Sequence, residues 1–434
     1  MTATSDVIII GSGVVGASIA LDLSRAGHQV TVVDKAGGPG HGSTSASSAV
    51  VRFNYSTRSG VATSWESRFR WEKWEDHLGH RDPNGLARFI RCGLAFLDVD
   101  IAPTETTCAL FEWAGIPYER WSSAQLARAI PGIDTGRYFP PKPVDSDAFF
   151  AAAEGVIGAV FTPDAGYVDD PQLAAANLAH AAQAVGARFR FRTTVTALAR
   201  VGSTWRVGLD GRDVIEAPIV VNAAGPWSTA LNRLAGAGED FTVSVAPLRQ
   251  EVHHVALPDP LRALSPSVPV LADMDLGTYI RPDADHGLLI GGTEPPCDPL
   301  EWIDDPDAAD PRPTRERFDA QVHRGARRLP GLGVPNRPRG IAGVYDAASD
   351  WTPIYDRTDQ DGYYVAMGTS GNQFKNAPVI GSLMTTLIEG VESGHDHDEN
   401  PLQFRAPHTG HTIDLGTFSR RRPPNAASTG TVMG

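Results

Sequence analysis

The chain has 434 residues, enough for two domains, and its 38 basic against 51 acidic side chains give a formal net charge of −13. This acidic excess argues against nucleic acid or an anionic membrane surface as a partner. The cysteines Cys92, Cys108 and Cys297 are widely spaced, and no apolar run approaches the roughly 20 residues of a membrane helix. We therefore expect a soluble, cytoplasmic protein with reduced thiols and without a metal site.

The first 35 residues carry the pattern of a dinucleotide site. A buried strand ends at Ile10, the sequence GSGVVG follows at residues 11–16, and a helix continues to Ala26 before a second strand, which ends at Asp34. In this order the first glycine permits the turn, the second lets the backbone approach a pyrophosphate, and the third lets the helix pack on the strand. We predict that the helix N-terminus faces phosphates and that Asp34 accepts hydrogen bonds from a ribose. The alternative is a glycine turn in an ordinary α/β domain.

Beyond the second strand, several further strands end in small residues. A Gly- and Ser-rich stretch covers residues 37–48, and the strands at residues 219–221 and 363–367 lead into turns at residues 222–227 and 368–371. Such turns lie at the carboxyl ends of parallel strands, where α/β sheets bind ligands. Helices are expected near residues 61–80, 104–130 (in two pieces), 170–185, 316–328 and 378–389, and a hairpin near residues 205–215.

The region from residue 240 to 294 differs in style, because it is rich in strands of antiparallel type. Three small-residue turns spread along the chain suggest one cofactor domain built from separated segments, with this sheet inserted between them. A large cofactor held along much of its length suits that plan, so FAD is favoured over NAD. We predict an α/β (α+β, two-domain) fold with a Rossmann-like FAD-binding domain and an inserted antiparallel-sheet substrate domain. The FAD-binding domain is assigned to residues 1–75, 150–235 and 335–400, the substrate domain to residues 76–149 and 236–334, and residues 401–434 to a peripheral tail.

Taken in order, these motifs resemble the D-amino-acid oxidase and sarcosine oxidase family of FAD enzymes, which includes glycine oxidases. The resemblance rests on the N-terminal fingerprint and on residues 42–44 leading to Arg52, 222–227, 291–293, 343–346 and 370–375. It implies that FAD extends across the Rossmann-like domain and that the isoalloxazine lies at the interface with the antiparallel domain. It further implies oxidation of an amine to an imine, which water then hydrolyses.

The fingerprint and the resemblance together assign cofactor contacts along the whole chain. The expected FAD-binding residues are Gly11, Gly13, Val14, Val15, Gly16, Asp34, Lys35, Ser43, Thr44, Ser45, Val195, Ala224, Gly225, Trp227, Gly343, Gly371, Asn372, Gln373, Phe374 and Lys375.

Within the family, this chain is most similar to the monomeric sarcosine oxidase branch. That branch holds the substrate carboxylate with an arginine, matched here by Arg52, and a lysine, matched by Lys375 in the segment SGNQFK. Two cations can bind a carboxylate and orient the adjacent C–H bond toward flavin N5, which accepts the hydride. The D-amino-acid and glycine oxidase branch has an arginine where this chain has Tyr345. Arg52 could instead contact solvent or an FAD phosphate, and Lys375 could be a solvated loop residue.

Three departures from the sarcosine oxidases bear on the chemistry. Gly343 stands where they carry a cysteine bonded to the flavin, so FAD should be non-covalent. Leu289 stands where they carry a lysine that speeds reaction with oxygen, and leucine does not stabilise developing superoxide. This favours a dehydrogenase that passes electrons to another acceptor. Thr293 replaces a histidine of the substrate pocket, so a substrate other than sarcosine itself is expected.

Other candidates follow from strand geometry. Tyr279 lies on a strand of the substrate domain and could face the flavin, with packing as the alternative; with Tyr345 it completes the predicted catalytic set of Arg52 and Lys375. The adjacent His253 and His254 point to opposite faces of a strand, so one of them could reach the pocket.

The sequence thus predicts an FAD-dependent amine or amino-acid oxidoreductase. Its expected partners are a carboxylate-bearing amine and either oxygen or another electron acceptor, including a partner protein. Three alternatives remain: a dehydrogenase of 2-hydroxy acids, the flavin-bearing subunit of a multi-subunit sarcosine oxidase-like complex, and an NAD-only Rossmann protein.

Overall fold

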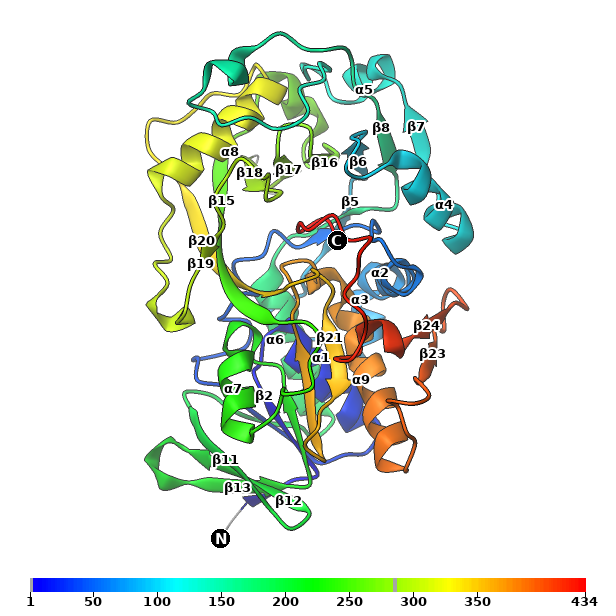
Figure 1. Ribbon diagram of the computed structural model, residues 1–434, viewed down its shortest axis with the longest axis vertical. Coiled ribbons are helices and arrows are strands. Elements are labelled where there is room, and N and C mark those ends of the chain that lie inside the picture. The colour runs from blue at the N-terminus through cyan, green and yellow to red at the C-terminus, as the bar shows by residue number, and fades with distance from the viewer. Residues whose placement is uncertain (1–2, 284–286) are drawn as a thin grey trace.

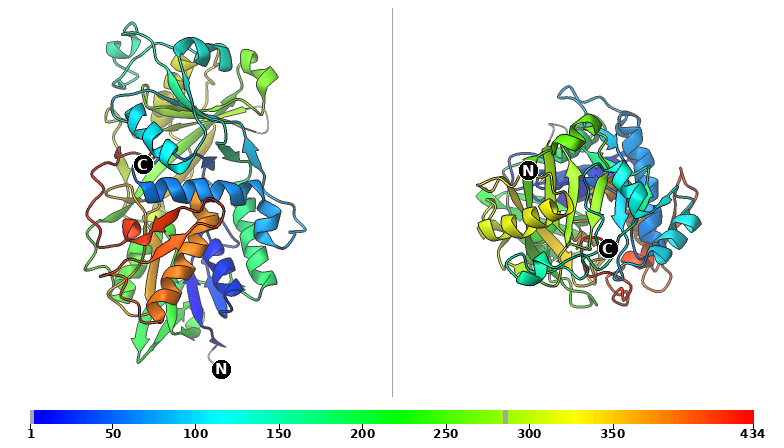
Figure 2. Two further views of the ribbon diagram at one scale, coloured as in Figure 1. Left: turned by 90° about the vertical axis from the view of Figure 1, so that its right-hand side faces the viewer. Right: turned by 90° about the horizontal axis from the view of Figure 1, so that it is seen from above.

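The computed structural model of the protein describes residues 3–283 and 287–434. Figure 1 shows two regions stacked along the long axis, with a mainly parallel sheet in the lower one and an antiparallel sheet in the upper one. Figure 2 shows that α2 (Arg58–Glu72) lies across the waist between them. Within the described ranges, no helix is long and apolar enough to cross a membrane.

The lower region is built on a six-stranded sheet in the order β10-β3-β2-β14-β22-β21, parallel except for the last pair. Its strands are β2 (Val7–Ile10), β3 (Val30–Val33), β10 (Arg188–Arg190), β14 (Ile219–Asn222), β21 (Ile354–Arg357) and β22 (Tyr363–Met367). Every residue of β2 is buried, and its sequence is a continuous apolar run. Such a run is typical of a strand that is covered on both faces of its sheet.

Different structures cover the two faces of this sheet. On one face α1 (Val14–Arg25) packs between α6 (Pro171–Ala184) and α9 (Ala377–Glu392). On the other face Ile8 and Ile10 pack with Trp205 of a small four-stranded sheet. That sheet contains β1 (Ala3–Thr4), β11 (Val195–Val201), β12 (Thr204–Leu209) and β13 (Val214–Ala217). The alternation along β2 follows the two-residue period of a strand.

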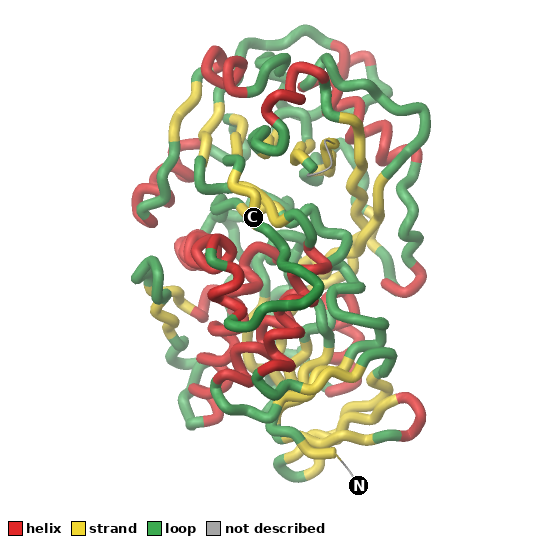
Figure 3. Tube along the Cα trace, turned by 180° about the vertical axis from the view of Figure 1, so that it is seen from behind, coloured by secondary structure: helices red, strands yellow, loops and turns green. Residues whose placement is uncertain are grey.

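The upper region is a nine-stranded sheet, antiparallel except where β6 runs parallel to β16. Its strands are β6 (Leu94–Leu97), β7 (Glu119–Trp121), β8 (Ala159–Thr162), β15 (Val245–Ala256), β16 (Val270–Asp273), β17 (Thr278–Pro282), β18 (Gly287–Gly292), β19 (Glu301–Trp302) and β20 (Gly340–Ala348). Helix α8 (Arg315–Arg328) packs on one face of this sheet. The opposite side of the sheet faces the waist (Figures 1 and 3).

The remaining helices and strands lie outside the two large sheets. They are α3 (Trp74–Leu78), α4 (Thr104–Ala114), α5 (Ser123–Ala129), α7 (Ser228–Ala235), the three-stranded sheet of β4 (Val50–Val51), β9 (Gly166–Val168) and β5 (Phe89–Arg91), and the hairpin of β23 (Gln403–Arg405) and β24 (Thr412–Asp414).

The predicted fold class is confirmed: a parallel cofactor-type sheet is combined with an antiparallel sheet. Local details differ from the sequence prediction. The helix expected at residues 61–80 is two helices, α2 and α3, which meet at Lys73. Strands β8 and β20, assigned to the cofactor domain, pair with strands of the upper sheet. Each strand precedes the return of the chain to the lower region, at α6 and at β21, and hydrophobic periodicity does not reveal where that return occurs.

The tail expected to be peripheral is instead part of the core. Arg420 is 1% exposed and pairs with Asp356 and Asp398, and Arg422 pairs with Asp350. The chain then returns to the waist, where its end lies between the two regions (Figure 1). The prediction was wrong because contacts remote in sequence hold this segment: buried ion pairs, together with apolar side chains such as Leu415 and Phe418 that pack into the core.

Candidate active site

The turn between β2 and α1 has the geometry of a dinucleotide site. Gly11 has φ +107°, and a Cβ there would lie 2.3 Å from the carbonyl oxygen of Ala223. A Cβ on Gly16 would lie 2.1 Å from the carbonyl oxygen of Gly11, so the helix fits against the strand only without a side chain. A Cβ on Gly13 would have the Oγ1 of Thr44 as its nearest atom, at 3.2 Å. Gly13 therefore leaves space at the helix N-terminus, which is where an anionic phosphate is stabilised.

Asp34 ends β3 beside this turn. Its carboxylate accepts hydrogen bonds from the backbone N–H and the hydroxyl of Ser12, both at 2.6 Å, and from the N–H of Ala36 at 2.8 Å. These bonds fix the carboxylate at the mouth of the turn, where its remaining lone pairs can accept from ribose hydroxyls. Nearby, Lys35 Nζ lies 4.0 Å from the ring centroid of Trp227 and pairs with Asp307. The indole N–H of Trp227 is buried without a hydrogen-bond partner in the described residues.

A cavity of about 840 Å³ extends from the glycine turn to Arg52 and Lys375. Its lining combines the open helix N-terminus, small residues and apolar walls, and it includes the unpartnered indole of Trp227. A long, partly anionic and partly aromatic cofactor fits this lining, as FAD does. Of the expected cofactor residues, those that line the cavity are Gly11, Gly13, Val14, Val15, Asp34, Lys35, Ser43, Thr44, Val195, Ala224, Gly225, Trp227, Gly371, Asn372, Gln373, Phe374 and Lys375.

Three expected cofactor residues lie outside this lining. Gly16 serves the packing of helix on strand described above. Ser45 closes a turn in which its hydroxyl donates to the carbonyl of Gly42 at 3.0 Å. Gly343 lies on β20, where a Cβ would come within 2.7 Å of the Cβ of Ala46. No cysteine is among the residues that line the cavity.

Arg52 and Lys375 meet at the far end of the cavity. They are 5% and 2% exposed and come from opposite ends of the chain. The Arg52 guanidinium donates to the carbonyl oxygens of Asn54 and Val432, and Lys375 Nζ donates to the carbonyl oxygen of Asn372 at 2.5 Å. Burial lowers the pKa of Arg52, and burial together with the charge of Arg52 holds the pKa of Lys375 well below its ordinary value.

This pair differs from the other buried cations. In the described part of the chain, neither Arg52 nor Lys375 has a carboxylate within 4.0 Å, whereas every other buried arginine does. Those paired arginines are Arg68, Arg70, Arg249, Arg281, Arg324, Arg328, Arg420 and Arg422. Buried charges are normally compensated by an opposite charge. The uncompensated pair therefore marks a place where an anion is expected to bind.

Tyr55, which the sequence analysis did not single out, lies between the two cations. Its ring centroid is 5.3 Å from Arg52 Cζ and 4.7 Å from Lys375 Nζ, so it contributes cation–π stabilisation to both. Its hydroxyl donates to the carbonyl oxygen of Asn372 at 2.7 Å and accepts from Asn376 at 3.0 Å. Burial raises the pKa of Tyr55 to about 12. The sequence held one signal for this role: Tyr55 is an aromatic residue three positions after Arg52.

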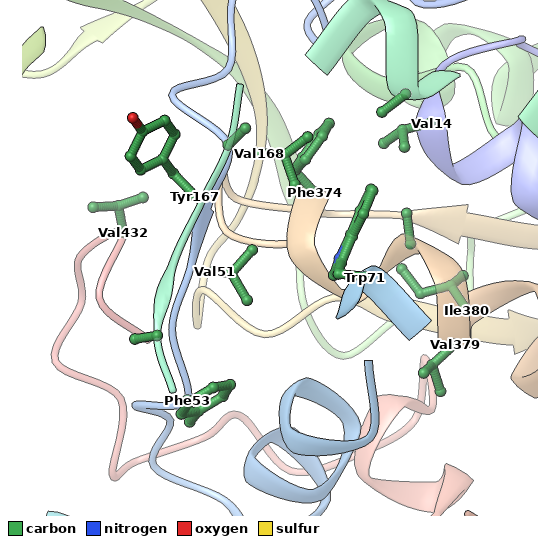
Figure 4. Close-up of a cluster of buried hydrophobic side chains, with 14 of the residues drawn as sticks. Val14, Val51, Phe53, Trp71, Tyr167, Val168, Phe374, Val379, Ile380 and Val432 are labelled. Atoms are coloured by element: carbon green, nitrogen blue, oxygen red, sulfur yellow. The ribbon is translucent and has the colours of Figure 1, made fainter. Parts of the chain in front are cut away.

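The hydrophobic core beneath the site holds Lys375 in place. In Figure 4, Phe374 and Trp71 face each other, and their rings stack with centroids 5.5 Å apart. The indole of Trp71 and the hydroxyl of Ser67 both donate to the carbonyl oxygen of Lys375. Helix α2 thus positions the turn that carries this lysine.

Tyr279 and Tyr345, the two tyrosines of the predicted catalytic set, line the cavity, each against a glycine. A Cβ on Gly291 would lie 2.3 Å from the Tyr279 ring, and one on Gly371 would lie 2.2 Å from the Tyr345 ring. The Tyr279 hydroxyl shares a hydrogen bond with Ser48 Oγ at 2.6 Å. Burial raises the pKa of Tyr279 to about 12 and that of Tyr345 well above its ordinary value, so both are neutral.

The other side chains singled out from the sequence lie away from the cavity lining. His253 is fully buried against Phe318, and neither it nor His254 lines the cavity. Leu289 pairs with Arg281 across β17 and β18, and Thr293 is buried; neither of these lines the cavity. Among the histidines that the structure describes, only His41, near the nucleotide end, lines the cavity.

The chain end contributes residues that the sequence analysis missed. Val432 and Met433 line the cavity beside the two cations and are 8% and 5% exposed. The N–H of Val432 donates to Glu294 Oε2 at 2.7 Å, and Gln250 donates to Glu294 Oε1 at 3.1 Å. Burial raises the pKa of Glu294 to about 8. No local pattern links residue 432 to residue 52, so nothing in the sequence signalled this arrangement.

Comparison with known proteins decides the family. The family model described as FAD dependent oxidoreductase (DAO) matches residues 6–387. The chain belongs to this family. Glycine oxidase from Geobacillus kaustophilus is 28% identical over 401 residues, covering 91% of this chain and 96% of that protein. The 4-methylaminobutanoate oxidase (formaldehyde-forming) of Paenarthrobacter nicotinovorans is 25% identical over 434 residues, covering 92% of this chain and 47% of that protein.

The solved structures agree on the fold. The crystal structure of L-proline dehydrogenase from P. horikoshii superposes with a TM-score of 0.75 at 21% identity, covering 97% of this chain and 98% of that one. The predictions of an FAD-dependent oxidoreductase and of FAD as its cofactor are confirmed. The matched residues run from the dinucleotide turn to α9, so they include both Arg52 and Lys375.

Proposed function

We propose that this DAO family member oxidises the C–N bond of an amino acid or N-alkyl amino acid to an imine, which water then hydrolyses. The observation that carries the proposal is the pair of buried cations without a carboxylate partner, Arg52 and Lys375, in the same cavity as the dinucleotide turn. A substrate carboxylate supplies the missing negative charge. Charge-assisted hydrogen bonds from both cations then fix its position.

The bound FAD supplies the two-electron acceptor. The protein's part is to bind, orient and desolvate the substrate. Arg52 and Lys375 hold the carboxylate, and Tyr55 keeps the two cations close together. Because the pKa of Lys375 is low in the empty pocket, Nζ can take up a proton as the anion arrives. A substrate ammonium group is a ready donor of that proton, and its loss leaves the neutral amine from which hydride is removed.

The finer features of the proposal concern the cofactor linkage, the branch and the acceptor. Absence of a cysteine from the cavity lining supports non-covalent FAD. The pairing of Arg52 with Lys375 supports a substrate site of the sarcosine oxidase type, and the tyrosine at position 345 supports the same branch. Leu289 stands where the sarcosine oxidases carry a lysine, but it lies outside the cavity lining and so does not decide the acceptor; both oxygen and another acceptor, including a partner protein, belong to the proposal. Names of relatives support both an oxidase and a dehydrogenase.

Anaerobic bleaching of the flavin tests this function. The purified protein is mixed with amino acids, N-methyl amino acids and 2-hydroxy acids, and air is then admitted. Bleaching by an amine, with release of ammonia or methylamine, is the expected result. Bleaching by 2-hydroxy acids alone would replace the proposal with C–OH oxidation. Rapid re-oxidation with peroxide would identify an oxidase despite Leu289.

A further inference from the structure

Residues 429–434, called here the roof segment, form a wall of the candidate substrate site. Two of its side chains, Val432 and Met433, line the cavity beside Arg52 and Lys375. The segment is reached only after the chain has been anchored by the buried ion pairs of Arg420 and Arg422. Its position is therefore set by the folded core and not by chance contact of a loose end.

The backbone of the roof segment is held from both regions of the molecule. On one side Arg52, which follows β4, donates to the carbonyl oxygen of Val432. On the other side Glu294, which follows β18, accepts from the N–H of Val432 at 2.7 Å. Glu294 adopts φ +48°, a strained conformation for a residue with a side chain, to reach this position. The backbone N–H and the carbonyl oxygen of Val432 are thus both hydrogen-bonded, and these bonds fix the positions of the side chains of Val432 and Met433.

The upper sheet contributes apolar walls to the same cavity. The buried side chains that line it from this sheet include Leu94, Val252, Val270 and Ala272. With Val432 and Met433, the cavity therefore has apolar side chains from both the upper sheet and the roof segment.

No carboxylate of the described cavity lining is placed to receive a basic side chain there, and Glu294, outside the lining, is engaged by Val432 and Gln250. Among the described residues, the acids that line the cavity are Asp34, Asp307 and Asp346. The first two lie at the nucleotide end. Asp346 accepts a hydrogen bond from Thr369, and burial raises its pKa. A cationic substrate side chain would therefore be buried without a partner, which is costly.

We infer that the roof segment selects the substrate's side chain, and that the site takes an amino acid or N-alkyl amino acid whose side chain is apolar. This inference rests on the proposed function, because Arg52 and Lys375 must hold the carboxylate for the side chain to meet the roof. Met433, at the cavity surface, limits the length of the side chain. Val432 contributes apolar surface next to the carboxylate.

Binding of unreactive straight-chain carboxylates tests the roof without turnover. Acetate, propionate, butyrate, pentanoate and hexanoate are titrated into the FAD-loaded protein, and the shift in flavin absorbance gives each dissociation constant. Each added methylene that is buried should tighten binding by about fourfold until the chain reaches the roof. In Met433→Ala, the tightening should continue for one or two carbons more than in the parent protein, and in Met433→Phe it should stop at a shorter chain. Val432→Thr, which keeps the shape but adds a hydroxyl, should lower the preference for hexanoate over acetate severalfold.

Two variants serve as controls. Met433→Leu conserves volume and should keep the chain-length pattern of the parent protein, and Val156→Ala changes an exposed valine. Melting temperature and FAD content are measured for all variants. Should Met433→Ala lose FAD, Val432→Thr and Met433→Phe still decide the question.

The outcomes separate the two proposals. A chain-length pattern that shifts with residue 433 and a polarity effect at residue 432 support the roof. An unchanged pattern in every variant, with acetate still bound, would overturn the roof and leave the carboxylate site intact. If no carboxylate perturbs the flavin and no amine bleaches it, the proposed function falls and the roof falls with it.

Discussion

The two ends of the cavity are built in different ways. At the nucleotide end, the glycine turn, the helix N-terminus and Asp34 belong to one β-α-β unit of neighbouring residues. At the substrate end, Arg52, Lys375 and Val432 come from three separate segments of the chain and meet only in the folded molecule. The first end depends on backbone shape and the second on compensation of buried charge. Substitutions at the two ends should therefore fail in different ways.

Gly16→Ala should have the largest effect, at the nucleotide end. The added Cβ would lie 2.1 Å from a backbone oxygen of the preceding turn, which has no room to move. We expect little or no FAD-loaded protein and a melting temperature lowered by at least several degrees. The FAD-to-protein absorbance ratio and thermal unfolding check this.

Gly13→Ala is the matched control for that experiment. Its Cβ meets only Thr44 Oγ1, at 3.2 Å, so the protein should fold while FAD binds more weakly. Stoichiometric FAD in Gly16→Ala would show that the helix does not need this close approach.

Arg52→Gln tests the substrate end. Loss of one partner of a buried charged interaction costs about 2–5 kcal/mol, so kcat/KM for the amine substrate should fall by about thirtyfold or more. FAD content should remain normal, unlike the result at Gly16. Stopped-flow bleaching under anaerobic conditions measures the rate.

Arg88→Gln is the control for Arg52, because Arg88 is an exposed arginine that pairs with Asp169. Its kcat/KM should stay near that of the parent protein. A loss below threefold in Arg52→Gln would mean that the guanidinium serves the roof segment and not the substrate.

The same difference explains what was predictable from the sequence. The nucleotide end was foreseen almost completely, because strand, glycines, helix and acid follow one another within residues 6–34. The antiparallel sheet was foreseen from its strand-rich region. Arg52 and Lys375 were identified only through resemblance, since nothing local distinguishes them from surface cations.

Tyr55, Glu294 and the roof segment were not foreseen. Each contributes through a partner that is remote in sequence: Tyr55 through Lys375, and Glu294 through Val432. Hydrophobic periodicity reports which face of an element is buried, but it does not report which distant segment lies on that face. Arg420 illustrates the point, because a run of arginines usually indicates a solvated surface.

Glu294→Gln tests the substrate end through the pH dependence of the free energy of unfolding. The pKa of Glu294 is about 8 in the folded protein against an ordinary value near 4.5, so the folded state holds one proton more over that interval. Stability must then fall as pH rises from about 5 to 8, by up to about 1.4 kcal/mol per pH unit. Glutamine does not titrate, and it keeps an oxygen that can accept from Val432. Urea unfolding at several pH values should show a flatter profile for the variant, and parallel profiles would contradict the assignment.

Lys375 should make carboxylate binding depend on pH. In the empty pocket its pKa lies well below the ordinary value, and a bound anion raises it, so binding takes up a proton between the two pKa values. The affinity for acetate should fall by about tenfold per pH unit across that window as pH rises. Lys375→Met should bind acetate more weakly and with little dependence on pH. A pH dependence that survives this substitution would assign the proton to another group.

The smallest expected effect is at the nucleotide end, where Lys35 pairs with Asp307 across the cavity mouth. This ion pair is partly exposed, and such pairs contribute about 0–1 kcal/mol. Asp307→Asn should therefore speed FAD dissociation by no more than about fivefold, and added salt should reduce the difference between variant and parent because it screens the pair. Dissociation is followed by trapping released FAD with an excess of another apoflavoprotein. A change of a hundredfold would mean that closure of this loop, and not the glycine turn, retains the nucleotide, and the contrast between a locally built end and a distantly built end would no longer hold.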